Sequence, residues 1–148
     1  MKIQDEIKSN FNNEYQKARV NIHFTNNYLS EQLIEILKPL DLSPTQFNVL
    51  RILRGQYPAT SSIGLLKERM LDKNSDISRV VDRMLAKKLV VRKECKQDRR
   101  QKDIQISQLG LDVLSKIDEQ EKDLDKKMQH LSLEEVTLLN NLLDKIRD

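Results

Sequence analysis

The residues of this sequence that are best suited to chemistry fall in two polar clusters, at positions 74–83 and 98–100. The first cluster holds Asn74, Ser75, Asp76, Ser78, Arg79 and Arg83, and the second holds Asp98, Arg99 and Arg100. Arg can donate two parallel hydrogen bonds to guanine, and Asn can pair in the same way with adenine. The first cluster stands at the start of an expected helix, where a helix-turn-helix protein meets base edges. We therefore predict contacts with double-stranded DNA; the alternative is that these side chains are only solvated.

The second cluster lies at the tip of an expected β-hairpin. Arginine is attracted into narrow, A·T-rich minor grooves because these concentrate negative potential. Asp98 would be repelled by phosphate, so we expect it to hold an arginine in place. An ion pair with a purely structural role is the competing interpretation.

Positive charge is concentrated in the middle of the chain. The net charge of the 148 residues is only +3, but positions 67–102 hold 13 Lys or Arg against 6 Asp or Glu. The rest of the chain holds 13 basic against 17 acidic residues. A basic centre of this kind indicates a polyanionic partner. An ordinary solvated surface is the alternative interpretation.

Few residues have the spacing of a catalytic or metal site. His23 and His130 lie far apart in the sequence, and the three glycines are isolated, so neither a metal-ligand pattern nor a phosphate-binding loop is present. Cys95 has no nearby histidine in the sequence, and we expect it to pack in a strand, with a reactive thiol as the alternative. We therefore expect no enzymatic activity, no cofactor and no metal.

Capping residues and periodicity predict the helices that position the first cluster. Ser43 and Gln46 form a capping box at the start of one helix, and Ser61 or Ser62 caps the next. A third helix is expected over residues 77–89, after the capping residues at 74–76. Two short helices followed by one with a polar face make a DNA-reading unit.

Segments on both sides of this unit predict a hairpin and long flanking helices. A β-prone stretch at 89–92 and a period-two stretch at 104–106 indicate the two strands of the hairpin. Residues 1–40 carry an apolar stripe at helical spacing, with a break or kink expected at Asn12–Asn13 or Asn26–Asn27. Residues 108–148 predict two more helices, the first opened by Ser107 or Gln108 and the second by a capping box at Ser132. The first of these helices has an apolar stripe that begins at Leu109 and, on its wet face, the local pairs Asp118–Lys122 and Asp123–Lys127. Such long stripes cannot be buried against a small lobe, so we expect a second chain to cover them. The expected fold is mainly α with a small β-hairpin wing: a winged helix-turn-helix DNA-binding lobe over residues 41–107 and a dimerisation region formed by 1–40 and 108–148.

The order of these segments is similar to that of a known family. SPTQFNVLRIL, ISRVVDRMLAKKLV, DRR and IQISQLG, followed by two helices, resemble the MarR family of multiple-antibiotic-resistance regulators over nearly the whole chain. The resemblance implies a triangular homodimer whose first and last two helices form the interface, with the lobes on adjacent half-sites of a pseudo-palindrome. It implies a sequence-specific regulator, usually a repressor. It also implies that Asp98 braces a wing arginine, with Arg100 the first choice for the groove and Arg99 the second.

Three features depart from the family pattern. Family members often have Gly where the recognition helix ends, whereas this chain has Lys88, so we expect a different turn there. The redox-sensing members have a reactive Cys near the first helix and the zinc-sensing members have clustered His and acidic ligands, and both are missing here. Redox and metal sensing are therefore disfavoured.

Many family members also bind small anionic aromatic molecules, which release the DNA. Phe11, Tyr15, Phe24 and Tyr28 could line such an effector pocket, although aromatic residues at helical spacing belong more often to a core, and we favour the core interpretation.

Two other functions remain as alternatives. One is a protein-interaction module that uses the winged helix without reading DNA, and the other is a thiol-sensing regulator that uses Cys95. No run approaches the roughly 18 apolar residues of a membrane span, and the start lacks the apolar centre of a signal peptide, so a cytoplasmic protein is expected.

Overall fold

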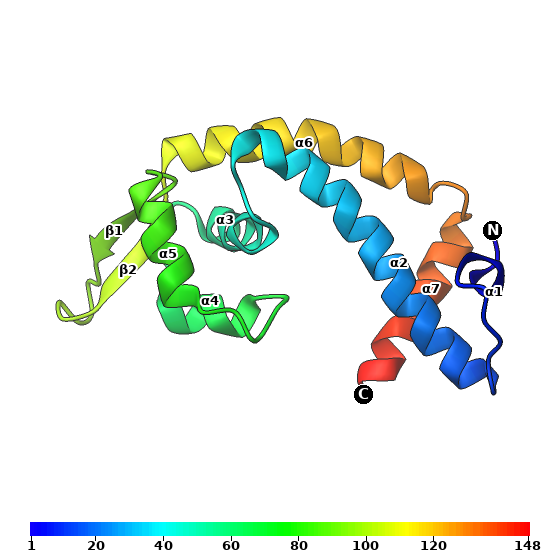
Figure 1. Cartoon of the computed structure of the whole chain (residues 1–148). Helices are drawn as coiled ribbons and strands as arrows, with labels where there is room; N and C mark the ends of the chain where they lie inside the picture. The colour runs from blue at the N-terminus through cyan, green and yellow to red at the C-terminus, as the bar shows by residue number, and fades with distance from the viewer.

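The structure is a computed structural model that describes all residues, 1–148. Its elements, in chain order, are α1 (Ile3–Glu6), α2 (Glu14–Leu37), the 3₁₀ helix η1 (Lys38–Leu40), α3 (Pro44–Gln56), α4 (Ile63–Arg69), α5 (Ile77–Ala86), β1 (Val90–Glu94), β2 (Lys102–Ile106), α6 (Gln108–Met128) and α7 (Leu133–Arg147). The helices α3, α4 and α5 and the hairpin form a lobe at one end, and α2 and α7 form arms at the other, with α6 running between them (Figure 1). The predicted fold class, mainly α with a β-hairpin, is confirmed.

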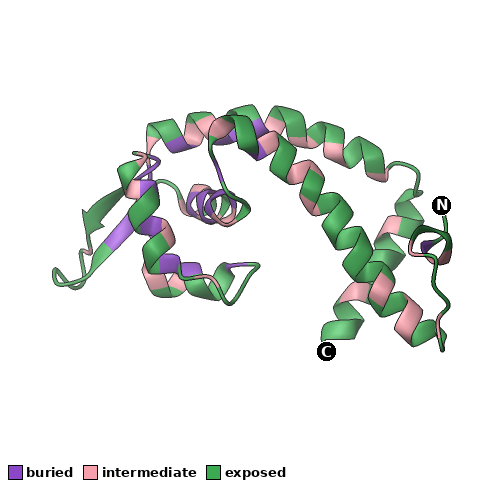
Figure 2. Cartoon of the chain, in the orientation of Figure 1, coloured by how far each residue is buried: buried purple, intermediate pink, exposed green.

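The lobe contains nearly all of the buried residues. A single cluster of 17 buried apolar side chains joins α3, α4, α5, the hairpin and the first half of α6, and Leu50, Leu66 and Met84 are completely buried within it. Burial is concentrated on the same elements in Figure 2, and most of α2 and α7 is exposed. The lobe is thus a rigid platform for the polar residues that it carries outward.

Helix α3 begins at the predicted capping box. The Ser43 hydroxyl accepts a hydrogen bond from the Gln46 backbone N–H at 3.1 Å, and the Gln46 side chain accepts one from the Ser43 N–H at 3.1 Å. The predicted caps of α4 and α6 are confirmed at Ser62 and Ser107. These short-range bonds satisfy backbone groups that the first turn of a helix leaves without partners.

The hairpin is antiparallel, with Val90 opposite Ile106 and Glu94 opposite Lys102. A bridge between Ser61 and Ile104 adds the segment before α4 to the edge of β2. The sheet therefore anchors the wing to the lobe at its root, while the tip projects beyond α5 (Figure 1).

The turn after α5 is not the different turn that we expected at Lys88. Lys88 has a φ of 60°, so it adopts the left-handed conformation in which Gly is usual. The Leu89 N–H donates to the Met84 carbonyl and the Lys88 N–H to the Leu85 carbonyl, both at 3.0 Å, which is the Schellman pattern of a helix end. The turn has the glycine-type shape without the glycine, because tertiary contacts of Leu89 fix it.

Helix α6 is packed against the lobe by its first half. Gly110, Leu114 and Ile117 are its buried residues, whereas Leu109, which we placed on the buried stripe, is exposed. A Cβ atom at Gly110 would lie 2.4 Å from the Leu89 carbonyl oxygen, so only glycine permits this close approach.

The ion pairs of α6 also differ from the local pairs that we predicted, Asp118 with Lys122 and Asp123 with Lys127. Asp118 instead accepts two hydrogen bonds from Arg54 of α3, at 2.7 and 3.1 Å. Asp123 pairs with Lys126, whose hydrogen bond and charge lower the pKa of the Asp123 carboxyl.

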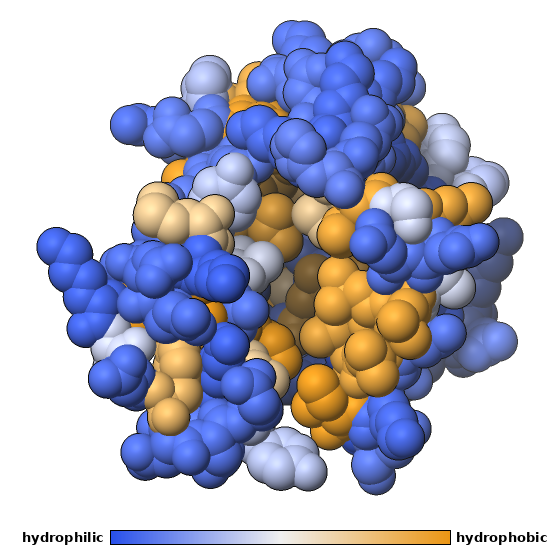
Figure 3. Space-filling view, turned by 90° about the vertical axis from the view of Figure 1, so that its right-hand side faces the viewer, coloured by the Kyte–Doolittle hydropathy of each residue, from blue (hydrophilic) through white to orange (hydrophobic).

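The arms begin with an interruption and remain largely uncovered. The predicted helix over 1–40 is broken between α1 and α2, where Asn13 caps α2 by accepting from the Gln16 N–H at 2.8 Å; there is no break at Asn26–Asn27. Large apolar side chains of α2, α7 and the turn before α7 are exposed: Tyr15, Ile22, Phe24, Tyr28, Leu29, Ile34, Leu131, Leu133, Leu138, Leu139, Leu142 and Ile146. Figure 3 shows a broad apolar area on the side of the molecule where the arms lie. None of the helices combines the length and apolar character needed to cross a bilayer.

Candidate nucleic-acid interface

The exposed face of α5 carries the central residues of the first polar cluster. Ile77, Val81 and Met84 point into the core, which turns Ser78, Arg79 and Arg83 outward to solvent. The strongly two-sided sequence of this helix fixes that orientation, because the apolar positions recur at steps of three and four. Asp76 caps the helix by accepting from the Arg79 N–H at 3.2 Å.

The loop before α5 is held by an acid that the sequence analysis missed. The Asp72 carboxylate accepts from the Asn74 N–H at 2.9 Å and from the Ser75 hydroxyl at 3.1 Å. The Asn48 side chain of α3 accepts from the Leu71 N–H at 2.9 Å and fixes the start of the same loop. Asn74 and Ser75 are therefore presented in an ordered turn at the helix N-terminus. An Asp two residues before an Asn was the only available signal in the sequence.

A second unpredicted contact joins α5 to the hairpin. Arg92 of β1 donates to the Asp82 carboxylate at 2.6 Å. The pair is partly exposed, so it contributes little to stability, but it links the two elements that would touch DNA. Ser78, Asp82, Arg92 and Lys102 line a small hollow between the helix and the wing.

The wing tip is ordered by Asp98, which holds Arg100 by its backbone N–H. Its carboxylate accepts from the backbone N–H of Arg100 at 2.9 Å, and its carbonyl accepts from the Gln101 N–H at 3.0 Å. No ion pair joins Asp98 to either arginine. Asp98 therefore holds Arg100 in place through the backbone and shapes the turn, and both guanidinium groups stay free in solvent.

Four arginines of the two clusters have no acidic partner. Arg79, Arg83, Arg99 and Arg100 are exposed, and each lies outside all eight ion pairs of the chain. Uncompensated guanidinium groups on one rigid lobe create a positive surface that attracts phosphate and can read guanine.

The other chemistry-bearing residues do not converge on a site. Cys95 lies directly after β1, not in the strand, and is half-buried. No group of three or more His, Cys, Asp or Glu side chains is placed to hold a metal ion.

The four aromatic residues that we associated with an effector do not form a core within the chain. Tyr15, Phe24 and Tyr28 are exposed, and Phe11 is half-buried against Glu14 and Lys17. The core interpretation is therefore wrong for the single chain, because α2 has no helix packed over this face. A cavity of about 350 Å³ lies nearby between α2, α3 and α6; apolar residues including Leu29, Leu33, Phe47, Met70 and Leu124 line it.

Comparison with known proteins settles the family. The model of the MarR family matches residues 42–102, which hold the helix-turn-helix and most of the wing. The HTH-type transcriptional regulator MhqR of Bacillus subtilis (strain 168) is 32% identical over 108 residues, 71% of this chain and 72% of that protein. The chain belongs to the MarR family. It is thus a transcription regulator, as the resemblance of its motifs implied.

Solved MarR structures share the architecture. A cysteine-to-serine variant of Escherichia coli MarR in complex with operator DNA is 28% identical, covers 93% of this chain and 99% of its own, and superposes with a TM-score of 0.78. A MarR-like transcription regulator from Bacillus cereus ATCC 10987 is 23% identical, with coverages of 90% and 96% and a TM-score of 0.77. The winged helix fold of this MarR protein is therefore confirmed.

Proposed function

We propose that this MarR protein binds a pseudo-palindromic site in double-stranded DNA as a homodimer and represses transcription by occupying the promoter. The observation that carries the proposal is the set of four unpaired arginines on α5 and the wing, held by a buried core. The fold is shared with an E. coli MarR variant solved with operator DNA, which supports the same mode of binding.

The residues have distinct roles in this proposal. Helix α5 enters the major groove, where Ser78, Arg79 and Arg83 meet base edges and phosphates. Asn74 and Ser75, held by Asp72, contact the bases or backbone at the start of the helix. The acids Asp76 and Asp98 act through the backbone groups that they bind, since a carboxylate facing phosphate would be repelled.

The wing supplies the minor-groove contact. Arg100 is the first choice and Arg99 the second, because both extend from the tip of a hairpin that is fixed only at its root. Narrow grooves attract arginine through their concentrated negative potential.

The arms, residues 1–40 and 108–148, form the dimer interface in this proposal, and residues 41–107 form the DNA-binding lobe. The support is the apolar area on α2 and α7, which a single chain leaves in water (Figure 3). Exposed apolar patches of this extent mark protein interfaces.

A small ligand that releases the DNA is a further part of the proposal. The cavity between α2, α3 and α6 has an apolar lining and one ion pair, Arg51 with Glu121 at 3.8 Å. It adjoins the segment of α2 that holds Phe24 and Tyr28, so these aromatic residues, together with Tyr15 and Phe11, remain the predicted effector contacts. The chain acts by binding and not by catalysis, and a DNA target places it in the cytoplasm.

Selection of bound DNA from random duplexes tests the proposal directly. We expect an enriched pseudo-palindrome with half-sites near 10 base pairs apart, centre to centre. Affinity should fall steeply with salt because phosphate contacts release counterions. Absence of any sequence preference, together with a stoichiometric protein partner, would favour the protein-interaction module instead.

Replacing Arg100 tests the wing. Arg100→Ala should lower DNA affinity by about 1–3 kcal/mol while the dimer stays intact. Lys116→Ala removes one exposed positive charge from the half of α6 that packs on the lobe, away from the proposed DNA contacts, and serves as the matched control. Fluorescence anisotropy on the selected site measures both, and equal affinities for the two variants would remove Arg100 from the interface.

A further inference from the structure

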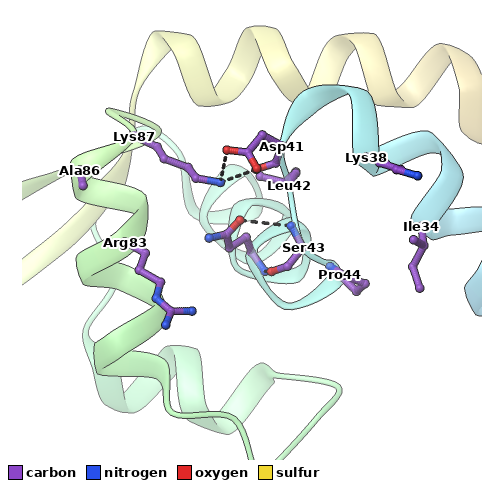
Figure 4. A pocket seen from close by; sticks show the side chains of 10 residues that line it. Ile34, Lys38, Asp41, Leu42, Ser43, Pro44, Arg83, Ala86 and Lys87 are labelled. Carbon is purple, nitrogen blue, oxygen red and sulfur yellow. Dashed lines mark hydrogen bonds and ion pairs between the residues drawn. The ribbon is translucent and has the colours of Figure 1, made fainter.

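A hollow of about 760 Å³ lies on the lobe between the C-terminal half of α5 and the connection from α2 to α3 (Figure 4). It is separate from the cavity between α2, α3 and α6, with which it shares only the lining residue Pro44. Arg83 of α5 and Lys87, the residue that follows α5, reach into it, and Lys38 lies on the opposite wall with its side chain turned away from that pair. Its apolar floor includes the buried Leu42.

The charges around this hollow are unbalanced. Three cations line it, Lys38, Arg83 and Lys87, against one carboxylate, that of Asp41. Lys87 is paired with Asp41 at 3.0 Å and also donates to the Asp41 carbonyl, whereas Arg83 and Lys38 have no acidic partner. The excess of two positive charges matches the charge of a phosphomonoester, which is about −1.5 to −2 at neutral pH.

The elements around the hollow add to this preference. The capped start of the 13-residue helix α3 forms one wall, and a helix N-terminus carries a partial positive charge. Arg offers a planar fork that fits phosphate oxygens, and Lys adds a mobile point charge. The Asp41 side chain is 93% exposed, so the contact that an incoming phosphate must replace is a weak surface pair.

We propose that this hollow binds a free phosphomonoester, with its phosphate held by Arg83 and Lys87 in place of Asp41. Resting on the proposed function, the binding has a consequence for DNA: Arg83 is engaged at the hollow and withdrawn from the major-groove face of α5. The ligand is thus a second effector, at a site distinct from the cavity between α2, α3 and α6.

Titration of the free protein with phenyl phosphate, followed by amide NMR, tests the site without DNA. We expect the Leu42, Ala86 and Lys87 resonances to shift, and neutral benzyl alcohol to leave them unchanged. Lys87→Met should weaken binding about fivefold, while Asp41→Asn, which removes the competing charge, should strengthen it about threefold. Asn tolerates the left-handed backbone of residue 41, so the turn is kept, and thermal melting confirms that both variants fold.

Shifts confined to the cavity between α2, α3 and α6 would overturn the proposal. Equal affinities of Lys87→Met and Asp41→Asn for phenyl phosphate would also overturn it. Loss of DNA affinity by Lys87→Met in the absence of ligand would assign the hollow to the DNA backbone and also overturn it. Phenyl phosphate at fixed ionic strength should lower DNA affinity about threefold in the unaltered protein and less in Lys87→Met. Because the titration contains no DNA, phosphate binding by a protein that selects no DNA sequence would refute the proposed function alone.

Discussion

The lobe and the arms of this protein are built from similar amphipathic helices, yet the lobe buries its apolar residues and the arms leave most of theirs exposed. The lobe buries a cluster of 17 side chains, whereas α7 buries none and α2 buries only Leu37. Helix sequence alone does not explain this difference, because α7 has as regular an apolar stripe as α3. The difference lies in what each helix has available to pack against, which is three helices and a hairpin in the lobe and, in the dimer that we propose, a second chain for the arms.

Helix α6 belongs to both regions and joins them. Its first half contributes Leu114 and Ile117 to the core of the lobe, and its second half is exposed along the arms. Two contacts with α3, from Arg54 to Asp118 and from Arg51 to Glu121, lie where it leaves the lobe. The two regions are therefore unequal in stability but mechanically continuous.

Charging the arm surface should have the largest effect. Leu142 of α7 is 51% exposed in the single chain, and Leu142→Asp should prevent dimerisation while the lobe stays folded. A monomer binds one half-site only, so DNA affinity should fall by about 10²-fold or more through lost avidity. Light scattering and anisotropy measure the two effects.

Asn140→Asp, at an exposed position on the opposite side of α7, is the control for the added charge. A Leu142→Asp protein that remains a dimer with full DNA affinity would show that the arms are not the interface.

A core deletion in the lobe should destabilise the chain independently of the arms. Leu50 is completely buried in α3, and Leu50→Ala should lower the free energy of unfolding by about 2–5 kcal/mol, since it leaves a cavity. The loss should not depend on protein concentration, whereas destabilisation by Leu142→Ala should be larger at low concentration, where dimers dissociate. Urea unfolding at two concentrations distinguishes these cases, and a similar concentration dependence in both variants would contradict the separation of lobe and arms.

The smallest effect concerns the turn that ends α5. Lys88→Gly should raise the free energy of unfolding by about 1 kcal/mol, because glycine adopts the left-handed conformation without strain. Ala86→Gly, two residues earlier in the regular helix, should instead lower it by up to about 1 kcal/mol. Changes of the same sign would mean that the backbone of residue 88 is not strained.

Local signals in the sequence predicted most of the elements. Ser43, Ser62 and Ser132 begin helices as expected, because a cap depends only on residues three positions away. The hairpin was also predictable, since a β-prone stretch and a stretch with alternating apolar residues flank a polar loop. The two polar clusters followed from the positions of these elements.

Contacts across the fold were not predictable in the same way. Asp118 has a lysine four residues later but pairs with Arg54, which is 64 residues away, so a local rule lost to tertiary packing. The Asp82–Arg92 pair joins α5 to β1, and the sequence alone does not show how close these two elements lie. Asp98 was expected to hold an arginine in place, and it does so through the backbone N–H of Arg100, a partner atom that the sequence does not specify.

Because Gly110 packs closely against Leu89, a rotation of α6 at the arms is transmitted to the lobe. The Ser107 side chain also donates to the Lys88 carbonyl at 2.7 Å, so the first turn of α6 is fastened to the last turn of α5. The 21 residues of α6 span roughly 32 Å at about 1.5 Å per residue. A rotation of about 5° at the arms would therefore move the fastened end by about 3 Å, close to the roughly 3.4 Å rise of one base pair. In the dimer that we propose, a small change in the angle between the two subunits is thus enough to move both α5 helices out of register with their grooves.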